Sequence, residues 1–462
     1  MEPTYVIAIE IGSSKIRAAL GTIDATNTLS IKAIEEEILS ESVRYGQVRN
    51  VMQVSETIRR ITTRLQSRES SHTIAGVYLA FGGLTMRSER RTQQRMFPNE
   101  QQIVQTHISD LTKDVAATQI PNRDIVEVQP CEFYVDRRKT TNPVGNYGRS
   151  IDGVFTLISA SSSLKKNLER VFENLSLKVL GYVVRPIAEA NLVLTSDEKR
   201  AGCMLVDFGA ETTTVVIYKD GNLVYLNTIP LGSRHITLDI MHVCHIEEQA
   251  EQRKRSLSQL SGNANAQSIH FDAMAEKDLT EIKNLVNART GEIIANILEQ
   301  IRFAELKNDD LPAGIIVVGS GARLHGFNDR LATVSRLPVR TGLMNNKMVR
   351  ITDSRIDTTN AIDVISILAD IKEDPIPCMV PVMQTEIPFN ETQPAQNIPT
   401  MGGGKKQPAP AKKAPVYEEP EDEDPEEEEI KPVKTGFFPR FVEKLKRNLT
   451  NYVSEDEDNI NE

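Results

Sequence analysis

The pattern acid–x–Gly occurs twice in this chain, each time at the end of an apolar run. The first copy reads Glu10-Ile11-Gly12-Ser13-Ser14-Lys15, and the second reads Asp207-Phe208-Gly209-Ala210-Glu211-Thr212-Thr213-Thr214. A second apolar run follows each copy, so each predicts a strand–turn–strand hairpin. Glycine in such a turn can adopt φ > 0 and lets backbone N–H groups approach an anion. A single copy is equally typical of an ordinary hairpin, but the pair predicts two related halves that grip a nucleotide phosphate, with Glu10 and Asp207 near a hydrated divalent cation.

A third glycine-rich turn follows the apolar run at 315–318. It reads Gly319-Ser320-Gly321, and Gly326 closes it. Because Gly319 and Gly321 have no side chain, a nucleoside could lie flat against this backbone. The chain has no G-x-x-x-x-G-K-[ST] motif and no G-x-G-x-x-G after a strand, so it is not a P-loop or Rossmann nucleotide-binding protein.

The net charge of −10 is concentrated in one segment, because 418–429 contains ten acids and no bases. The remaining residues are neutral overall, which argues against a general nucleic-acid binder. The four cysteines lie far apart and form no CxxC pair, as expected of free thiols in a reducing cytoplasm. We find no secretion signal and no run of eighteen apolar residues, so we expect no membrane span.

Residues 1–375 alternate strand-like and helix-like patterns, which is typical of an α/β protein. Two blocks interrupt the alternation, and each predicts an addition to one of the two halves. The predicted parts are a first-lobe core at 1–81 and 166–195 with 352–376, an inserted small α/β subdomain at 82–165, a second-lobe core at 196–242 and 311–351, and an outer subdomain of the second lobe at 243–310.

The composition changes after Pro375. Residues 377–434 are rich in Pro, Gly, Lys and then Glu, so they cannot bury a core and are predicted to form a disordered linker. An amphipathic helix is predicted at 435–453, followed by an acidic tail at 454–462. Its candidate membrane contacts are the apolar residues Phe437, Phe438, Phe441, Val442, Leu445, Leu449 and Tyr452 and the bases Arg440, Lys444 and Arg447.

This helix carries too many charges to span a bilayer. It can lie in the membrane interface, with its aromatic residues inserted and its bases against anionic headgroups. The alternatives are docking on the chain's own body or in the groove of a protein partner. A terminal position after a long linker favours the membrane anchor.

Taken together, these motifs resemble those of the FtsA family of bacterial cell-division proteins, which belongs to the actin-like ATPase superfamily. The two acid–x–Gly turns resemble the two phosphate motifs of the family, and 318–326 resembles its adenosine motif. The segment 185–190 is similar to the one that links the two halves, and 142–145 is similar to a turn of the inserted subdomain. Glu251 and Lys254 lie where the family has an acid and a lysine near the nucleoside.

The resemblance implies an actin-like (ribonuclease H-like) two-lobed fold. It also implies a protein that binds ATP and Mg²⁺ between its lobes, polymerises head to tail and tethers FtsZ filaments to the membrane during Z-ring assembly. The implied location is the cytoplasmic face of the inner membrane at the division site, as a peripheral membrane protein. The implied partners are the FtsZ C-terminal peptide, which Arg289 on the outer subdomain could contact, further copies of the chain, an anionic membrane surface and later division proteins.

The resemblance also assigns the residues of the site. The implied nucleotide-binding residues are Glu10, Gly12, Ser13, Ser14, Lys15, Asp207, Gly209, Thr212, Thr213, Glu251, Lys254, Gly319, Ser320 and Gly321. Glu10 and Asp207 would hold Mg²⁺ through water, and no catalytic residue is assigned.

The chain also departs from the family pattern. In the second turn Ala210 and Glu211 replace glycines and Thr214 replaces an acid, while Ser320 replaces a glycine of the third turn. Two unit charges about 4 Å apart repel by roughly 4 kcal/mol at an effective dielectric constant of about 20, so Glu211 should repel a γ-phosphate. A cation or Lys15 could offset this repulsion. We therefore expect nucleotide binding with slow or absent hydrolysis.

Two other functions fit the same body. An actin-fold kinase would need a carboxylate base beside a substrate pocket, and the sequence has no clear candidate for one. A pilus-assembly adaptor of the same fold resembles the body but lacks the terminal helix. Loss of membrane attachment on deletion of 435–462 would distinguish the family reading from both.

Overall fold

The computed structural model describes residues 3–39, 41–260, 276–344, 349–353, 355–373 and 375–382. All of them belong to one compact unit, Met1–Val382. The predicted linker beyond 382, the amphipathic helix at 435–453 and the acidic tail at 454–462 lie outside these residues.

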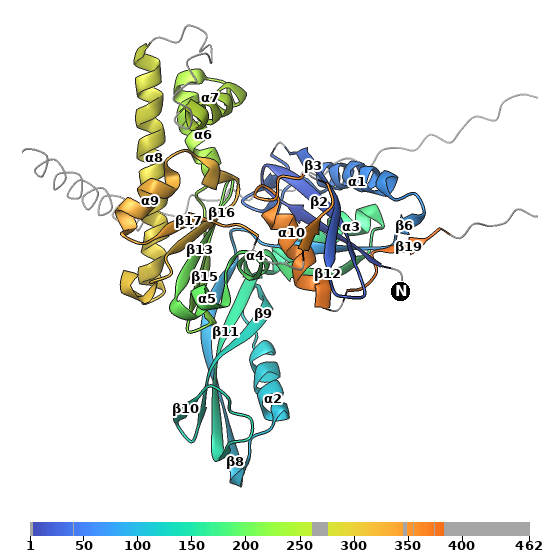
Figure 1. Ribbon diagram of the computed structural model, residues 1–462, viewed down its shortest axis with the longest axis vertical. Helices are drawn as coiled ribbons and strands as arrows, with labels where there is room; N and C mark the ends of the chain where they lie inside the picture. The colour runs from blue at the N-terminus through green and yellow to red at the C-terminus, as the bar shows by residue number, and fades with distance from the viewer. Residues whose placement is uncertain are drawn as a thin grey trace, which may run out of the picture. The chain divides into compact units, whose positions relative to one another are not determined.

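The first lobe is built on a six-stranded sheet whose strands are rich in buried β-branched residues (Figure 1). In spatial order the strands are β12 (Val179–Val184), β7 (Val77–Phe81), β1 (Thr4–Ile11), β2 (Lys15–Ile23), β3 (Leu29–Ile38) and β18 (Val349–Ile351). Strands β1 and β2 form the first predicted hairpin and pair from Thr4 with Ile23 to Ile11 with Ile16. Helix α10 (Ile362–Asp370) packs on β1 and β2, α1 (Val51–Arg68) packs on β2 and β3, and α3 (Ser162–Leu175) packs on α1.

The second lobe contributes five strands to a nine-stranded sheet. In spatial order the strands are β10 (Arg138–Thr140), β9 (Arg123–Val135), β11 (Tyr147–Ser161), β8 (Arg87–Gln102), β15 (Asn222–Ile229), β14 (Thr213–Lys219), β13 (Cys203–Phe208), β16 (Ile315–Val318) and β17 (Val339–Thr341). Strands β13 and β14 form the second predicted hairpin, in which Asp207 lies opposite Thr214.

The block predicted as an insertion forms the other end of this nine-stranded sheet. Its strands are β8 to β11, and α2 (Gln105–Ala116) packs on three of them. Strand β8 meets the second lobe at one register position, where Arg87 pairs with Asn227 of β15. The Thr156 hydroxyl of β11 also donates to the carbonyl of Leu223, at 2.8 Å. The insertion follows the first-lobe strand β7 in sequence but joins the sheet of the second lobe.

Helices of the second lobe stand beside its sheet. They are α6 (Ser233–Cys244), α7 (Glu247–Leu260), α8 (Glu276–Phe303) and α9 (Phe327–Ser335), and both α7 and α8 pack against α6 (Figure 1). Helix α4 (Arg185–Val193) connects the lobes in the chain, since β12 of the first lobe precedes it and α5 (Ser196–Ala201) and β13 of the second lobe follow it. A proline in its first turn fits the start of a helix.

Two predicted boundaries were wrong. Residues 349–351 were assigned to the second lobe, but β18 pairs in parallel with β3, so they extend the first-lobe sheet. The linker was predicted to begin at 377, but β19 (Met379–Pro381) pairs with β6 (His72–Ile74). Cys378 is fully buried beside this pairing. Its backbone N–H donates to the carbonyl of Tyr5 at 2.8 Å, which fixes this segment against β1. Proline is unfavourable within strands, so the prolines near these residues kept the sequence from indicating a strand here.

Two short strands and three 3₁₀ turns complete the described part. Strands β4 (Val43–Arg44) and β5 (Gln47–Val48) form a tight hairpin, and short 3₁₀ turns cover Asn308–Asp310, Ser320–Arg323 and Ile371–Glu373. The two residues at the tip of the β4–β5 hairpin, Tyr45 and Gly46, have φ values of 52° and 75°. Positive φ at both positions defines the type I′ turn that suits a two-residue hairpin.

Candidate functional site

The same hydrogen bond closes both acid–x–Gly hairpins. The N–H of Gly12 donates to the carbonyl of Lys15 at 3.0 Å, and the N–H of Gly209 donates to the carbonyl of Thr212 at 2.9 Å. Each turn therefore has a two-residue loop, Ser13-Ser14 in the first and Ala210-Glu211 in the second. This shared geometry confirms the hairpins expected from the sequence.

The carbonyl groups of the second turn are held by the start of helix α6. The N–H of Ser233 donates to Gly209 at 2.9 Å and that of Arg234 donates to Ala210 at 2.7 Å. A Cβ atom at Gly232 would lie only 2.4 Å from the carbonyl oxygen of Ala210, so this approach requires glycine. The helix thus fixes the second turn by its carbonyl groups.

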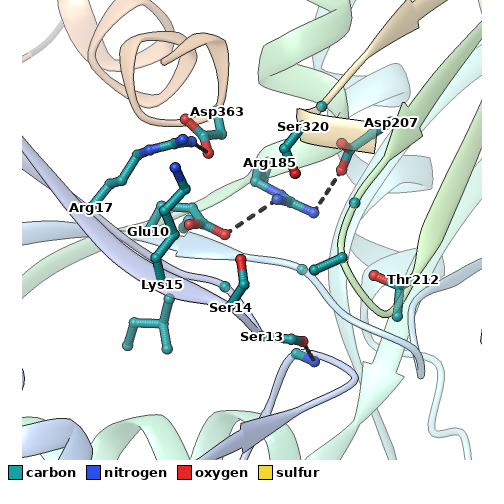
Figure 2. A pocket seen from close by; sticks show the side chains of 18 of the residues that line it. Glu10, Ser13, Ser14, Lys15, Arg17, Arg185, Asp207, Thr212, Ser320 and Asp363 are labelled. Carbon is teal, nitrogen blue, oxygen red and sulfur yellow. Dashed lines mark hydrogen bonds and ion pairs between the residues drawn. The ribbon is translucent and has the colours of Figure 1, made fainter. Parts of the chain in front are cut away.

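A cleft lies between the two turns, and the third turn and helices α4 and α10 also line it (Figure 2). Most of the predicted site residues line this cleft. They are Glu10, Gly12, Ser13, Ser14, Lys15, Asp207, Gly209, Thr212, Gly319 and Ser320. The other four do not line it: Thr213, Gly321, Glu251 and Lys254. The hydroxyl of Thr213 instead donates to the carbonyl of Leu231, at 2.7 Å.

Arg185 lies in the cleft between Glu10 and Asp207, the acids of the two hairpins. Its Nη2 is 2.8 Å from Oδ2 of Asp207, and its Nη1 donates to Oε1 of Glu10 at 3.2 Å (Figure 2). Its Nε is 3.8 Å from Oε1 of Glu189, one turn along α4. The sequence predicted a hydrated cation between Glu10 and Asp207, but in the structure a guanidinium bonds both carboxylates.

Three carboxylates surround this one guanidinium, and all three are almost completely buried. Burial raises the pKa of Glu10 to about 7, although Arg185 opposes the shift. Burial, and then the charge of Asp207, raise the pKa of Glu189 well above its usual value, which favours its protonated form. Burial by itself lowers the pKa of Arg185, but the carboxylates raise it above its ordinary value, so the guanidinium stays charged.

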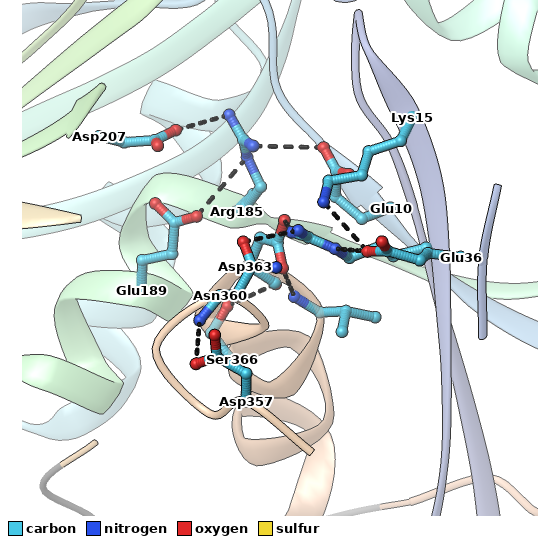
Figure 3. A network of polar contacts seen from close by, with 12 residues as sticks. Glu10, Lys15, Glu36, Arg185, Glu189, Asp207, Asp357, Asn360, Asp363 and Ser366 are labelled. Atoms are coloured by element: carbon cyan, nitrogen blue, oxygen red, sulfur yellow. Dashed lines mark hydrogen bonds and ion pairs between the residues drawn. The ribbon is translucent and has the colours of Figure 1, made fainter. Parts of the chain in front are cut away.

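A second guanidinium lies on the first-lobe side of the cleft. Arg17 is opposite Glu10 in the β1–β2 hairpin, and it bonds to Asp363 of α10, to Glu36 of β3 at 3.0 Å and to Asn360 at 3.0 Å (Figure 3). Lys15 bonds to the same Glu36, also at 3.0 Å. The only charge partner found for Lys15 within the described residues is therefore a half-exposed carboxylate.

Glu211 is buried in an ion-pair network and does not stand alone in the cleft. Its Oε1 is 2.7 Å from Nε of Arg44 and 2.9 Å from Nη1 of Arg234, and its Oε2 accepts the N–H of Tyr45 at 2.5 Å. The expected repulsion of about 4 kcal/mol could be offset by a cation, and two guanidinium groups compensate this charge. Lys15 was considered for that role and is paired elsewhere. Because Arg44 and Tyr45 belong to the first lobe, Glu211 also ties the two lobes together.

The glycines of the third turn are required by packing against strand β13. A Cβ atom at Gly319 would lie 2.5 Å from Oδ1 of Asp207, and one at Gly321 would lie 2.6 Å from the ring of Phe208. That ring stacks on Phe327 of α9, with ring centroids 4.7 Å apart. The ring of Phe208 therefore fills the space that a side chain at position 321 would need, and the nucleoside contact with this turn stays a prediction.

The acid and the lysine of helix α7 are bonded to each other and to α6. Nζ of Lys254 is 2.7 Å from Oε2 of Glu251 and donates to the hydroxyl of Thr237 at 2.8 Å and to the carbonyl of Ser233 at 3.1 Å. The structure thus places Glu251 and Lys254 at the start of α6, next to the residues that hold the second turn.

Arg289, the candidate contact for an acidic peptide, is already paired. Its Nε and Nη2 donate to both carboxylate oxygens of Asp239 at 2.6 and 2.8 Å, and its Nη1 donates to Glu292 at 2.5 Å. All three nitrogen atoms are bonded within the chain, so a peptide carboxylate would have to share Arg289 with Asp239 and Glu292.

The described residues contain neither a metal-ligand cluster nor a membrane-spanning helix. Within the described residues, no three or more His, Cys, Asp or Glu side chains are arranged to hold a metal ion. No helix in the described ranges is long and apolar enough to cross a membrane.

Comparison with known families decides between the possible readings of this fold. One family model, described as cell division protein FtsA, matches residues 204–360, and a second, described as the SHS2 domain inserted in FTSA, matches 83–159. Together they cover about half of the 462 residues. The chain belongs to the FtsA family. Its match to the inserted domain lies within the block 82–165.

Individual relatives agree with this assignment to the FtsA family. Cell division protein FtsA of Porphyromonas gingivalis is 29% identical over 371 residues, which cover 78% of this chain and 76% of the relative. The FtsA protein of Bacillus subtilis is 25% identical over 368 residues, which cover 74% of this chain and 80% of the relative. The chain is therefore a cell-division protein with an actin-like two-lobed fold.

A solved structure shares this fold with the FtsA chain. The PilM-PilN type IV pilus biogenesis complex superposes with a TM-score of 0.54 at 14% identity, over 80% of this chain and 99% of that one. At this identity the likeness concerns the fold alone. The family models exclude the adaptor reading, since both match FtsA.

Sequence reasoning missed several residues that line the cleft in this FtsA chain. They are Arg17, Gly46, Gly82, Gly83, Arg185, Glu189 and Asp363. A signal was present for three of them. Arg17 is a charge within an apolar strand, and the spacing of Arg185 and Glu189 places them on one face of a helix.

Proposed function

We propose that this chain binds ATP between its two lobes and tethers FtsZ filaments to the cytoplasmic face of the inner membrane. The observation that carries the proposal is the pair of identically closed turns that face each other across the cleft. Family membership supplies the cell-division setting. We further propose that the chain polymerises head to tail, binds the FtsZ C-terminal peptide and contacts later division proteins.

The residues of the cleft suit a nucleotide phosphate. No hydrogen bond from the N–H groups of Ser13, Ser14, Ala210 or Glu211 is found within the described part of the chain. Backbone N–H groups in such turns form concave sites for anions. Lys15 lines the same cleft and adds a cation.

Mg²⁺ does not fit between Glu10 and Asp207 while Arg185 bonds both carboxylates. Mg²⁺ requires a near-octahedral shell of oxygen atoms and usually retains several waters, which the guanidinium leaves no room for. Hydrolysis is proposed to be weak or absent, because the second turn has Thr214 where the family has an acid.

Membrane attachment is proposed to reside in 435–453. The segment combines aromatic residues with three bases, and each base near an anionic surface contributes on the order of 1 kcal/mol. A single copy should bind weakly, and a polymer should bind strongly because its anchors act together.

Co-sedimentation with anionic liposomes tests this function. The full chain should pellet with the liposomes and recruit FtsZ, and a truncation ending at Thr435 should remain in solution, with and without ATP. ATP should increase pelleting of the full chain only, since the truncation lacks the anchor. A truncation that pellets as well as the full chain would contradict the anchor, and a full chain that pellets without recruiting FtsZ would contradict the tether.

A further inference from the structure

The strongest unexplained feature of the cleft is the position of Arg185. It comes from α4, which connects the lobes in the chain, and it bonds one carboxylate from each lobe (Figure 2). These are the two carboxylates between which the sequence predicted a hydrated divalent cation. The side chain of Arg185 therefore supplies a positive charge where an ion was expected.

This guanidinium is held firmly. Its three nitrogen atoms face Glu10, Glu189 and Asp207, each of which is at most 5% exposed (Figure 3). Withdrawing one partner from a buried ion pair is strongly unfavourable, because it leaves an uncompensated charge. To enter between Glu10 and Asp207, a divalent ion would have to displace the guanidinium from both of these carboxylates.

We infer that Arg185 is a built-in cation that takes the place of a divalent metal, so that this cleft binds a nucleoside polyphosphate without Mg²⁺. The inference rests on the proposed nucleotide site and specifies its cation requirement. An arginine bonded to carboxylates still has N–H groups to offer a phosphate oxygen, and Arg185 lines the cleft.

A second observation points to a ligand at this position. Oε2 of Glu189 is buried and has no hydrogen-bond partner within the described residues, and Glu189 lines the same cleft. A buried polar atom without a partner is costly, so a ligand that bonds it is favoured. The raised pKa of Glu189 favours its protonated form, and a protonated carboxyl can donate to a phosphate oxygen but is a poor ligand for a metal ion.

Equilibrium binding of a fluorescent ATP analogue to the full chain tests this inference. The dissociation constant measured with Mg²⁺ and that measured with EDTA should agree within about threefold, which is less than 1 kcal/mol. Binding that is lost in EDTA would overturn the inference and leave the proposed nucleotide site intact. Absence of binding under both conditions would overturn the nucleotide site itself, and with it this inference.

Variants of Arg185 sharpen the test. Arg185→Gln removes the charge, so its binding should become dependent on Mg²⁺, with affinity at least about tenfold weaker in EDTA than in Mg²⁺. Arg185→Lys keeps a charge and should remain less dependent on Mg²⁺ than Arg185→Gln. Arg185→Gln that binds equally well in both conditions contradicts the inference. The wild-type comparison decides the matter even where a variant does not fold.

Discussion

Replacing Glu211 by alanine is expected to lower the free energy of unfolding by about 3 kcal/mol, the lower end of the cost of breaking a buried ion pair. The lower end applies because Arg44 is 35% exposed and regains water when its partner is removed. The substitution also removes the acceptor of the Tyr45 N–H, so the contact between the lobes is lost at two points, Arg44 and Tyr45. Nucleotide affinity should fall as well, since the two turns are no longer held facing each other. Urea unfolding and ATP-binding measurements on the same preparation check both effects.

Glu247→Ala is the matched control. It removes another carboxylate bonded to Arg234, at 2.8 Å, but that carboxylate is 44% exposed and lies on the second lobe. Exposed pairs contribute at most about 1 kcal/mol, so the control should change stability little. Equal losses in the two variants would show that Glu211 acts only as one more partner of Arg234 and not as a tie between lobes.

Gly319→Ala is expected to destabilise the protein by about 3 kcal/mol or more and to abolish nucleotide binding. Gly319 has φ 88° and ψ 164°, a region that only glycine occupies without strain of about 1 to 3 kcal/mol. The added Cβ would also lie 2.5 Å from Asp207 and 2.6 Å from the carbonyl oxygen of Phe208, and strand β13 cannot move away without disrupting its sheet. Thermal unfolding and ATP binding measure the two effects.

Gly326→Ala separates the steric contribution from the backbone contribution. Gly326 belongs to the same turn and has φ 72°, but an added Cβ would meet nothing within 4 Å. Its cost should therefore be limited to the left-handed conformation, about 1 to 2 kcal/mol, with binding retained. If both variants lose binding and stability equally, the contact with Asp207 is not what requires glycine at 319.

The hairpins and the two-lobed body could be predicted because local signals specify them. Acid–x–Gly between two apolar runs determines a hairpin within about fifteen residues, and no distant contact is needed. The short strand β19 could not be predicted, because its pairing with β6 depends on residues about three hundred positions away. The same holds for β18, which joins β3 across the whole second lobe in sequence.

The chemistry of the cleft was harder to predict than its location. The sequence indicates that Glu10 and Asp207 approach one another, but not that Arg185 enters between them, because that depends on how α4 is placed. The cations that compensate Glu211 were not identified from the sequence for a similar reason. Arg44 is distant in sequence and belongs to the first lobe, so the approach of the two lobes brings it to this carboxylate, where Arg234 of α6 also binds.

Photo-crosslinking of the full chain with 8-azido-ATP, followed by mass mapping of the labelled peptides, tests the nucleotide site most directly. The reactive group is on the base, so label should appear in peptides from α6, α7 or the turn at 319–326, and excess ATP should remove it. Label confined to other parts of the chain, or label that ATP does not displace, would contradict a nucleotide bound between the two turns.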